Sequence, residues 1–179
     1  MDEQTNPAEL VLAARRGDDE AFYRLMVLHH DKLYRIAFAY FRSEADALEA
    51  IQEVTYRAYM KLHSLRKPDY AGTWLVRILI NYCNDERRRR SRQAEYRSGG
   101  IPDERADVTE IRAVRDSLES ALDVLEPRQK QIVILKYFED LTIREIAAAM
   151  QYPDGTIKTW LYKALRKLKD YMRKDGEPD

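Results

Sequence analysis

The side chains best suited to recognition chemistry lie near the C-terminus. Thr142 to Glu145 has the capping-box spacing that opens a helix, and Tyr152 to Gly155 predicts a tight turn before a second helix capped by Thr156. That second helix would turn an apolar stripe inward and leave hydroxyl, aromatic and cationic groups outside. The outward residues are Lys158, Thr159, Tyr162, Lys163 and Arg166. Such groups hydrogen-bond base edges and pair with phosphates, so the pattern predicts a DNA-binding helix-turn-helix, with a purely structural hairpin as the alternative.

A second set suited to nucleic acid lies in the first half of the chain, on a helix expected to be capped by Thr73. One sector of this helix carries Trp74, Arg77, Asn81 and Arg88. Aromatic, amide and guanidinium groups together stack on unpaired bases and hydrogen-bond to them. The sector therefore predicts contact with single-stranded nucleic acid, although Trp74 could equally be a core residue.

An acidic stripe is expected on the preceding helix, which Ser43 caps and which runs to about His63. Its members are Asp46, Glu49, Gln52 and Glu53, opposite an apolar side of Leu48, Ile51, Thr55 and Leu62. The stripe could dock a basic protein surface, and an ordinary solvated face is the alternative. No histidine falls on that face, so we expect no metal site, no cofactor and no catalytic residue.

The elements that must position these side chains are expected to be helices. Glycine and proline are scarce, at 6 each in 179 residues, which favours an all-α chain. Apolar residues recur at helical spacing in a first helix between Asn6 and Gly17 and in a second to about Phe41. We predict a four-helix domain over residues 1–91, a flexible linker over 92–108 and a second domain over 109–179. The linker would span about 56–61 Å when fully extended.

Charge is balanced overall but segregated along the chain. The 31 basic and 31 acidic residues cancel, yet Glu86 to Arg97 and Thr156 to Lys174 are strongly basic, whereas Asp103 to Glu126 is mainly acidic. Two separate, salt-sensitive contacts with a polyanion are therefore predicted.

The cellular compartment is inferred from the apolar segments and cysteines that the sequence lacks. The longest stretch without Asp, Glu, Lys or Arg runs only from Ile146 to Pro153, and no apolar leader follows the start, so neither a membrane span nor a signal peptide is expected. The single cysteine, Cys83, forms no internal disulfide. We expect a protein of the reducing cytoplasm.

Three segments together resemble bacterial RNA polymerase sigma factors of the extracytoplasmic-function group, short sigma-70 relatives that keep only the second and fourth sigma domains. They are Ala47–Val54, Thr73–Ile78 with Asn81 and Asp85, and Leu141–Ala147 with Gly155–Thr159. The resemblance implies a sigma-2-like four-helix domain and a sigma-4-like helix-turn-helix domain. It further implies an initiation factor, not an enzyme, that binds core RNA polymerase and promoter DNA and assists promoter melting.

The resemblance also implies a role for each set. The acidic stripe would meet the β′ clamp helices, with the β flap as a further polymerase contact. The sector from Trp74 to Arg88 would act on the −10 element, helped by the loop from Leu65 to Ala71, which in relatives holds a flipped base. Thr159, Tyr162 and Lys163 would face −35 base edges, with Lys158 and Arg166 nearer phosphate. An anti-sigma factor, often membrane-anchored, would be a partner.

Two positions depart from the family pattern. Ala50 stands where a larger aliphatic residue is usual, and Trp160 replaces a frequent arginine. Two other readings of the whole chain remain: a LuxR-type helix-turn-helix regulator, because Leu141 to Glu145 is similar to the opening of that motif, and a helical adaptor that binds only proteins.

Overall fold

A computed structural model describes residues 6–98 and 121–174, and every regular element in those two ranges is helical. The N-terminal part contains α1 (Pro7–Arg15), α2 (Asp19–Phe41), α3 (Glu44–Lys61), the short turns η1 (Leu62–Ser64) and η2 (Pro68–Tyr70), and α4 (Ala71–Ser98). The C-terminal part contains α6 (Pro127–Val133), the π-helical η3 (Ile134–Phe138), α7 (Ile143–Met150) and α8 (Asp154–Lys174). The all-α prediction is confirmed.

Side-chain caps set the starts of the first three helices. Asn6 accepts a hydrogen bond from the Ala8 amide at 3.0 Å, Asp18 accepts from Ala21 at 3.0 Å, and Ser43 accepts from Asp46 at 3.3 Å. Each cap satisfies a backbone donor that the helix leaves without a partner. The starts expected at Asn6 and Ser43 are therefore confirmed.

The helix that carries the predicted base-stacking sector differs from expectation at both ends. Pro68 opens η2, which runs directly into α4 at Ala71, so Thr73 lies inside the helix and the predicted Thr73 cap is wrong. At the other end α4 continues to Ser98. Ion pairs from Glu86 to Arg89 and Arg90 support this arginine-rich stretch as an exposed helix. The irregular segment expected from Arg92 therefore begins no earlier than residue 99.

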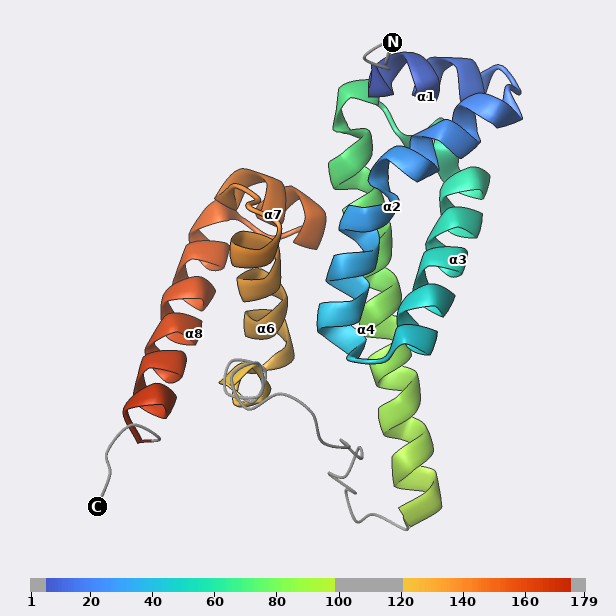
Figure 1. Cartoon of the computed structure of the whole chain (residues 1–179). Coiled ribbons are helices and arrows are strands. Elements are labelled where there is room, and N and C mark those ends of the chain that lie inside the picture. Colours follow the sequence, from blue (N-terminus) through green and yellow to red (C-terminus); the bar gives the residue numbers. More distant parts are fainter. Residues whose placement is uncertain (1–5, 99–120, 175–179) are drawn as a thin grey trace.

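The core of the N-terminal part lies between α2, α3 and α4. Leu25, Leu33 and Ile36 of α2 and Leu75 and Leu79 of α4 are almost completely buried. Burying a side chain of this size stabilises the fold by about 1.5–3 kcal/mol. These contacts fix α4 against the bundle over its first half, while its later residues project away from it (Figure 1).

The C-terminal part is built around the turn between η3 and α7. The Leu141 amide donates to the Leu135 carbonyl at 3.0 Å, and Asp140 takes a left-handed backbone conformation with φ of 51°. Thr142 then opens α7 with the predicted capping box: its hydroxyl accepts from the Glu145 amide at 3.3 Å, and the Glu145 carboxylate accepts from the Thr142 amide at 2.8 Å. The backbone hydrogen bond from Thr142 lowers the pKa of Glu145.

The second helix of the motif begins earlier than predicted. The Pro153 carbonyl already accepts from the amides of Thr156 and Ile157, at 2.9 and 3.2 Å, so α8 starts at Asp154. Thr156 is therefore a helical residue, and its prediction as the cap is wrong.

The two parts pack together. Helix α7 contacts α4, η3 contacts α2, and buried residues of both parts form one continuous cluster. Figure 1 shows the C-terminal helices beside α2. No helix within residues 6–98 and 121–174 is long and apolar enough to cross a membrane.

Gly72 is a tight point in this packing. A Cβ built on it would lie 3.1 Å from Cε1 of His29, a ring whose Nε2 is buried, whereas a Cβ on Gly155 would meet nothing within 4 Å. We expect Gly72→Ala to lower the free energy of unfolding by about 1 kcal/mol, because the ring must move and that outweighs the helix-propensity gain. Gly155→Ala is the matched control and should stabilise by about 0.5–1 kcal/mol. Urea titration measures both, and equal stabilisation by both variants would contradict this account of Gly72.

Candidate nucleic-acid interface

The turn of the helix-turn-helix is closed by backbone geometry. Gln151 ends α7 in the left-handed conformation, with φ of 61°, and the Tyr152 amide donates to the Ala147 carbonyl at 3.1 Å. The stripe facing the core is anchored by Ile157 and Ala164, which are fully buried. Helix α8 is thereby held with its opposite side outward.

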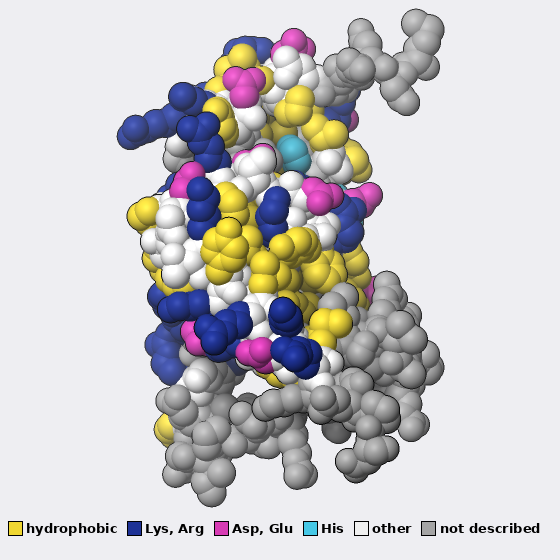
Figure 2. All heavy atoms as spheres, turned by 90° about the vertical axis from the view of Figure 1, so that its left-hand side faces the viewer, with side chains coloured by type: hydrophobic (Ala, Val, Ile, Leu, Met, Phe, Trp, Pro, Cys, Tyr) yellow, Lys and Arg dark blue, Asp and Glu magenta, His cyan; other side chains and the backbone are white. Residues whose placement is uncertain are grey.

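All five residues predicted to read DNA on α8 are exposed. They are Lys158, Thr159, Tyr162, Lys163 and Arg166, and Tyr162 is 73% exposed. The Thr159 hydroxyl donates to the Gly155 carbonyl at 2.9 Å, so it can offer DNA an acceptor or its methyl group. On the side of the molecule that carries α8, Figure 2 shows many lysine and arginine side chains among hydrophobic ones.

Trp160 has a structural role at the edge of this face. Its ring makes an edge contact with Tyr152, centroids 4.8 Å apart, and the Arg128 guanidinium lies over both rings, 5.3 Å from Trp160 and 5.4 Å from Tyr152. This aromatic-cation cluster joins α6, the turn and α8. The sequence does not single out Arg128, because only the fold brings it beside Trp160.

The base-stacking sector on α4 is also assembled. Arg77, Asn81 and Arg88 are exposed on one side of the helix, and Trp74 is half-buried against the core. Trp74 and Arg77 line a cavity with Leu65, Arg66 and Tyr70 of the preceding loop. Trp74 thus packs against the core and also lines the cavity, and its stacking on bases stays a prediction.

A second basic and aromatic surface lies further along α4. Its residues are Asp85, Arg88, Arg89, Arg92, Gln93 and Tyr96, and Tyr96 is 93% exposed. Arginine and an exposed ring are the groups that follow a nucleic-acid backbone and stack on its bases. The sequence does not indicate Tyr96, because it falls within the predicted linker over 92–108.

The acidic stripe on α3 is only partly free. Glu49 and Gln52 are exposed, and Glu53 accepts a hydrogen bond from Arg57 one turn on at 2.7 Å. Asp46 instead makes a two-fold contact with Arg90 of α4, at 2.7 and 3.0 Å. Leu48, expected on the buried side, is 44% exposed and lies beside Glu49.

Exposed Tyr56 and Met60 extend the same helix face toward its C-terminus. An apolar centre with a charged rim is the usual anatomy of a protein interface. The sequence pattern indicates only the charged half of this face, because it predicts Leu48 on the apolar side and does not single out Tyr56 or Met60.

Arg90 and Glu86 link the acidic stripe to α4. Glu86 is buried and accepts hydrogen bonds from Arg89 and Arg90 at 2.7–2.8 Å. These contacts, chiefly that of Arg89, lower the pKa of Glu86 to about 2, and Arg90 lowers the pKa of Asp46. These ion pairs therefore fix the position of α3 relative to α4.

We expect Glu86→Gln to lower the free energy of unfolding by about 1–2 kcal/mol at neutral pH, because charge-assisted hydrogen bonds are lost. The folded pKa of Glu86 is depressed, so its contribution is complete above about 4.5 and is lost as the pH falls toward about 2. In denaturant titrations at several pH values, the free energy of unfolding should fall less with decreasing pH in the variant than in the wild type. Parallel curves for the two proteins would contradict this role.

Comparison with known proteins matches both parts of the chain. The family model for Sigma-70 region 2 matches residues 25–93, and that for Sigma-70, region 4 matches residues 115–168. RNA polymerase sigma factor SigV of Bacillus subtilis is 32% identical over 154 residues, covering 82% of this chain and 88% of its own. RNA polymerase sigma-E factor of Streptomyces antibioticus is 30% identical over 158 residues, which cover 88% of this chain and 87% of that protein. The ECF RNA polymerase sigma factor SigW of Bacillus subtilis is 23% identical, covering 89% and 92%.

Solved structures share the fold. The sigma factor RpoE from Bartonella quintana, in complex with the anti-sigma factor NepR, gives a TM-score of 0.72 at 22% identity, covering 85% of this chain and 96% of its own. CnrH in complex with the cytosolic domain of CnrY also gives 0.72 at 22% identity, covering 96% and 99%. The region 2 match occupies the part that a LuxR-type regulator would use as a sensor. The chain therefore belongs to the sigma-70 family, in the extracytoplasmic-function group, and is a transcription initiation factor that directs RNA polymerase to promoters.

Proposed function

We propose that α3, α4 and α8 divide the work of initiation in this sigma factor. The exposed basic side of α8 carries the proposal, because five residues suited to base edges and phosphates stand together on it. In the proposed complex Thr159, Tyr162 and Lys163 face base edges of the −35 element. Lys158 and Arg166 contact the flanking phosphates, and Arg128 adds a phosphate contact from its position over Trp160.

The α4 side acts on the −10 element. The cavity beside Trp74 accepts an unstacked base, while Arg77, Asn81 and Arg88 hold the strand. Unstacking costs a few kcal/mol, and stacking returns about 1–3 kcal/mol per captured base. Polymerase performs the chemistry, and this chain supplies only binding energy.

The α3 face grips polymerase. Glu49, Gln52 and Glu53 form its acidic rim, and Leu48 and Tyr56 form its apolar centre. We assign this face to the β′ clamp helices and the C-terminal domain to the β flap. Asp46, paired with Arg90, supports the face from its edge.

An anti-sigma factor is the proposed regulator, because RpoE and CnrH were each solved in complex with a partner and RpoE's is named as an anti-sigma factor. Its membrane anchoring and the cytoplasmic location of this chain are parts of the same proposal. Pull-down from the native host tests for that partner.

In vitro transcription with purified core polymerase and a library of promoter fragments tests the function. The chain should produce promoter-specific starts without any other initiation factor, and core polymerase alone should not. A helical adaptor would give no specific start at all. That result would overturn the proposal.

A further inference from the structure

We propose that Ser91 of α4 is a phosphorylation site for a protein kinase that selects serines preceded by arginines, and that the added phosphate weakens DNA binding by this part of α4. The modification itself depends only on the sequence and the exposure of the helix around Ser91. Its effect on promoter DNA rests on the proposed function, in which Arg88 of the same stretch holds the −10 strand.

The sequence before Ser91 has the charge pattern that such a kinase recognises. Arg87–Arg90 fill all four positions that precede it, whereas every other serine of the chain has at most one arginine in the same four positions. Kinases select substrates partly by charge, and a kinase with an acidic substrate groove favours arginines just before the acceptor serine. Charge complementarity therefore indicates Ser91 as the acceptor and a kinase with an acidic groove as the partner.

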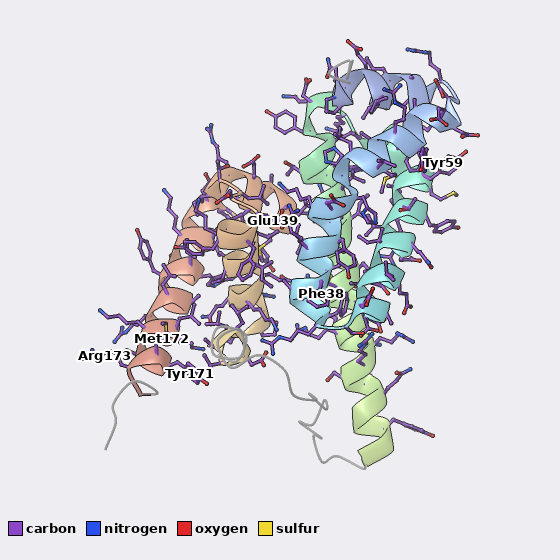
Figure 3. The ribbon with its side chains drawn as sticks, viewed as in Figure 1. Phe38, Tyr59, Glu139, Tyr171, Met172 and Arg173 are labelled. Carbon is purple, nitrogen blue, oxygen red and sulfur yellow. The ribbon has the colours of Figure 1, made fainter. Side chains whose placement is uncertain are left out.

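Ser91 lies where α4 has left the bundle. Among the described side chains of α4, Glu86 is the last buried one, and Ser91 beyond it is exposed. Figure 3 shows the side chains of these last turns standing clear of the other described helices. A helix end with few tertiary contacts opens locally at little cost in free energy. A kinase can therefore draw the segment around Ser91 into its groove while the first half of α4 stays packed in the core.

The helix itself does not require a serine at this position. Serine is a poorer helix former than the arginine, glutamine and alanine residues that surround it, because its hydroxyl competes for backbone hydrogen bonds. On an exposed face, any of those residues would stabilise α4 more. The hydroxyl at position 91 is therefore better explained by chemistry than by helix stability.

The side chain of Ser91 lines a basic surface hollow of about 300 Å³. The other lining residues are Arg87, Arg88 and Arg92, and no described acidic side chain lines it. Arg92 Nε donates a hydrogen bond to the Arg88 carbonyl at 3.3 Å, so its side chain folds back over the preceding turn. A phosphate on Ser91 would thus be surrounded by guanidinium groups, which bind phosphate through charge-assisted hydrogen bonds.

The phosphate would occupy the cations that DNA needs. A phosphoserine carries about −1.5 to −2 charges at neutral pH, which offsets most of the positive charge of the three arginines in the hollow. Its oxygens would accept hydrogen bonds from Arg88, which is then no longer available to the −10 strand. No residue of the α3 polymerase face lines the hollow. Phosphorylation should therefore weaken DNA binding and leave binding to core polymerase unchanged.

The chemical step is an ordinary phosphoryl transfer from ATP, which the kinase supplies. The bond between the γ-phosphorus and the oxygen that bridges it to the β-phosphate breaks, and a bond from that phosphorus to Ser91 Oγ forms. ADP leaves, and the proton of the serine hydroxyl passes to the catalytic base of the kinase.

Mass spectrometry tests the site. The full chain is incubated with ATP and the catalytic subunit of cyclic-AMP-dependent protein kinase, which prefers arginines two and three residues before its serine. We expect one phosphoryl group per chain, located at Ser91 by peptide mapping, and the same phosphopeptide in protein isolated from the native host. Ser91→Ala should abolish the modification, and Ser98→Ala, at the end of the same helix, is the matched control and should retain it. Modification elsewhere only, or host protein without phosphate at Ser91, would overturn the site.

Fluorescence anisotropy with a fluorescein-labelled single-stranded oligonucleotide of mixed sequence at low salt tests the effect. The phosphorylated chain should bind about tenfold more weakly than the unmodified chain, with a salt dependence reduced by about one to two phosphate contacts. Ser91→Asp, with a single charge, should weaken binding about threefold, and the neutral isostere Ser91→Asn should bind as the unmodified chain does. Circular dichroism establishes that each form keeps its helices.

Equal affinity of the folded phosphorylated and unmodified chains would overturn the proposed effect on DNA. Equal weakening by Ser91→Asp and Ser91→Asn would overturn its electrostatic cause. None of these measurements contains polymerase, so their failure leaves the transcription assay of the proposed function intact. Failure of that assay would in turn leave the phosphorylation of Ser91 standing.

Discussion

Replacing Lys163 with alanine is expected to weaken binding to the −35 element about 5- to 150-fold and to relax its sequence preference. Lys163 is exposed near the middle of the outward side of α8, beside Tyr162. A side chain that bonds a base edge contributes about 1–3 kcal/mol to discrimination. Fluorescence titration of holoenzyme with duplexes carrying intact or scrambled −35 elements, at one fixed salt concentration, measures both effects.

Lys158→Ala is the matched comparison for this experiment. Lys158 lies at the flank of the same helix and is assigned to phosphate, so its loss should weaken both duplexes equally and reduce the salt dependence by about one phosphate contact. If Lys163→Ala also weakened both duplexes equally, Lys163 would be a phosphate contact instead. Unchanged affinity in the Lys163 variant would remove α8 from the −35 assignment.

Replacing Glu53 with lysine is expected to lower the affinity for core polymerase at least tenfold. The side chain is 37% exposed and stands at the acidic rim of α3. A basic partner surface would meet a like charge, which costs several kcal/mol in a desolvated interface. Competition against a labelled relative for core polymerase provides the affinity.

The control for Glu53 carries the same charge change elsewhere. Glu9→Lys alters an exposed acid in the first turn of α1 and should compete as wild type. Thermal unfolding of both variants separates weak binding from loss of fold, because Glu53 also accepts a hydrogen bond from Arg57. A folded Glu53→Lys protein with wild-type competition would show that polymerase does not use this face.

Local chemistry made most helices predictable. Asn6, Ser43 and Thr142 each combine a capping side chain with an apolar period, and each opens a helix as expected. The predictions failed where two signals competed. Before Thr73 and Thr156 a proline leads into the helix earlier: Pro68 opens η2, which continues into α4, and Pro153 directly precedes α8. Each threonine therefore lies inside its helix.

Contacts between residues far apart in the sequence cannot be predicted from local sequence patterns. Periodicity placed Asp46 and Glu53 on one stripe, but it could not show that Asp46 pairs with Arg90, 44 residues later. Nor could it show Arg35 meeting Glu139 or Arg128 covering Trp160, since those pairs form only when separate elements pack. The residues of the proposed DNA and polymerase faces could be predicted, because for exposed residues the local helix pattern alone decides which of them share a face.

The chain has two tryptophans, and one lies at each of its two proposed DNA contacts. Trp74 borders the cavity on α4, and Trp160 lies against Tyr152 and the Arg128 guanidinium. Each proposed DNA contact therefore has its own fluorescent side chain. With Trp74→Phe or Trp160→Phe, the intrinsic emission of the remaining indole can time upstream docking and strand capture independently, without any attached dye.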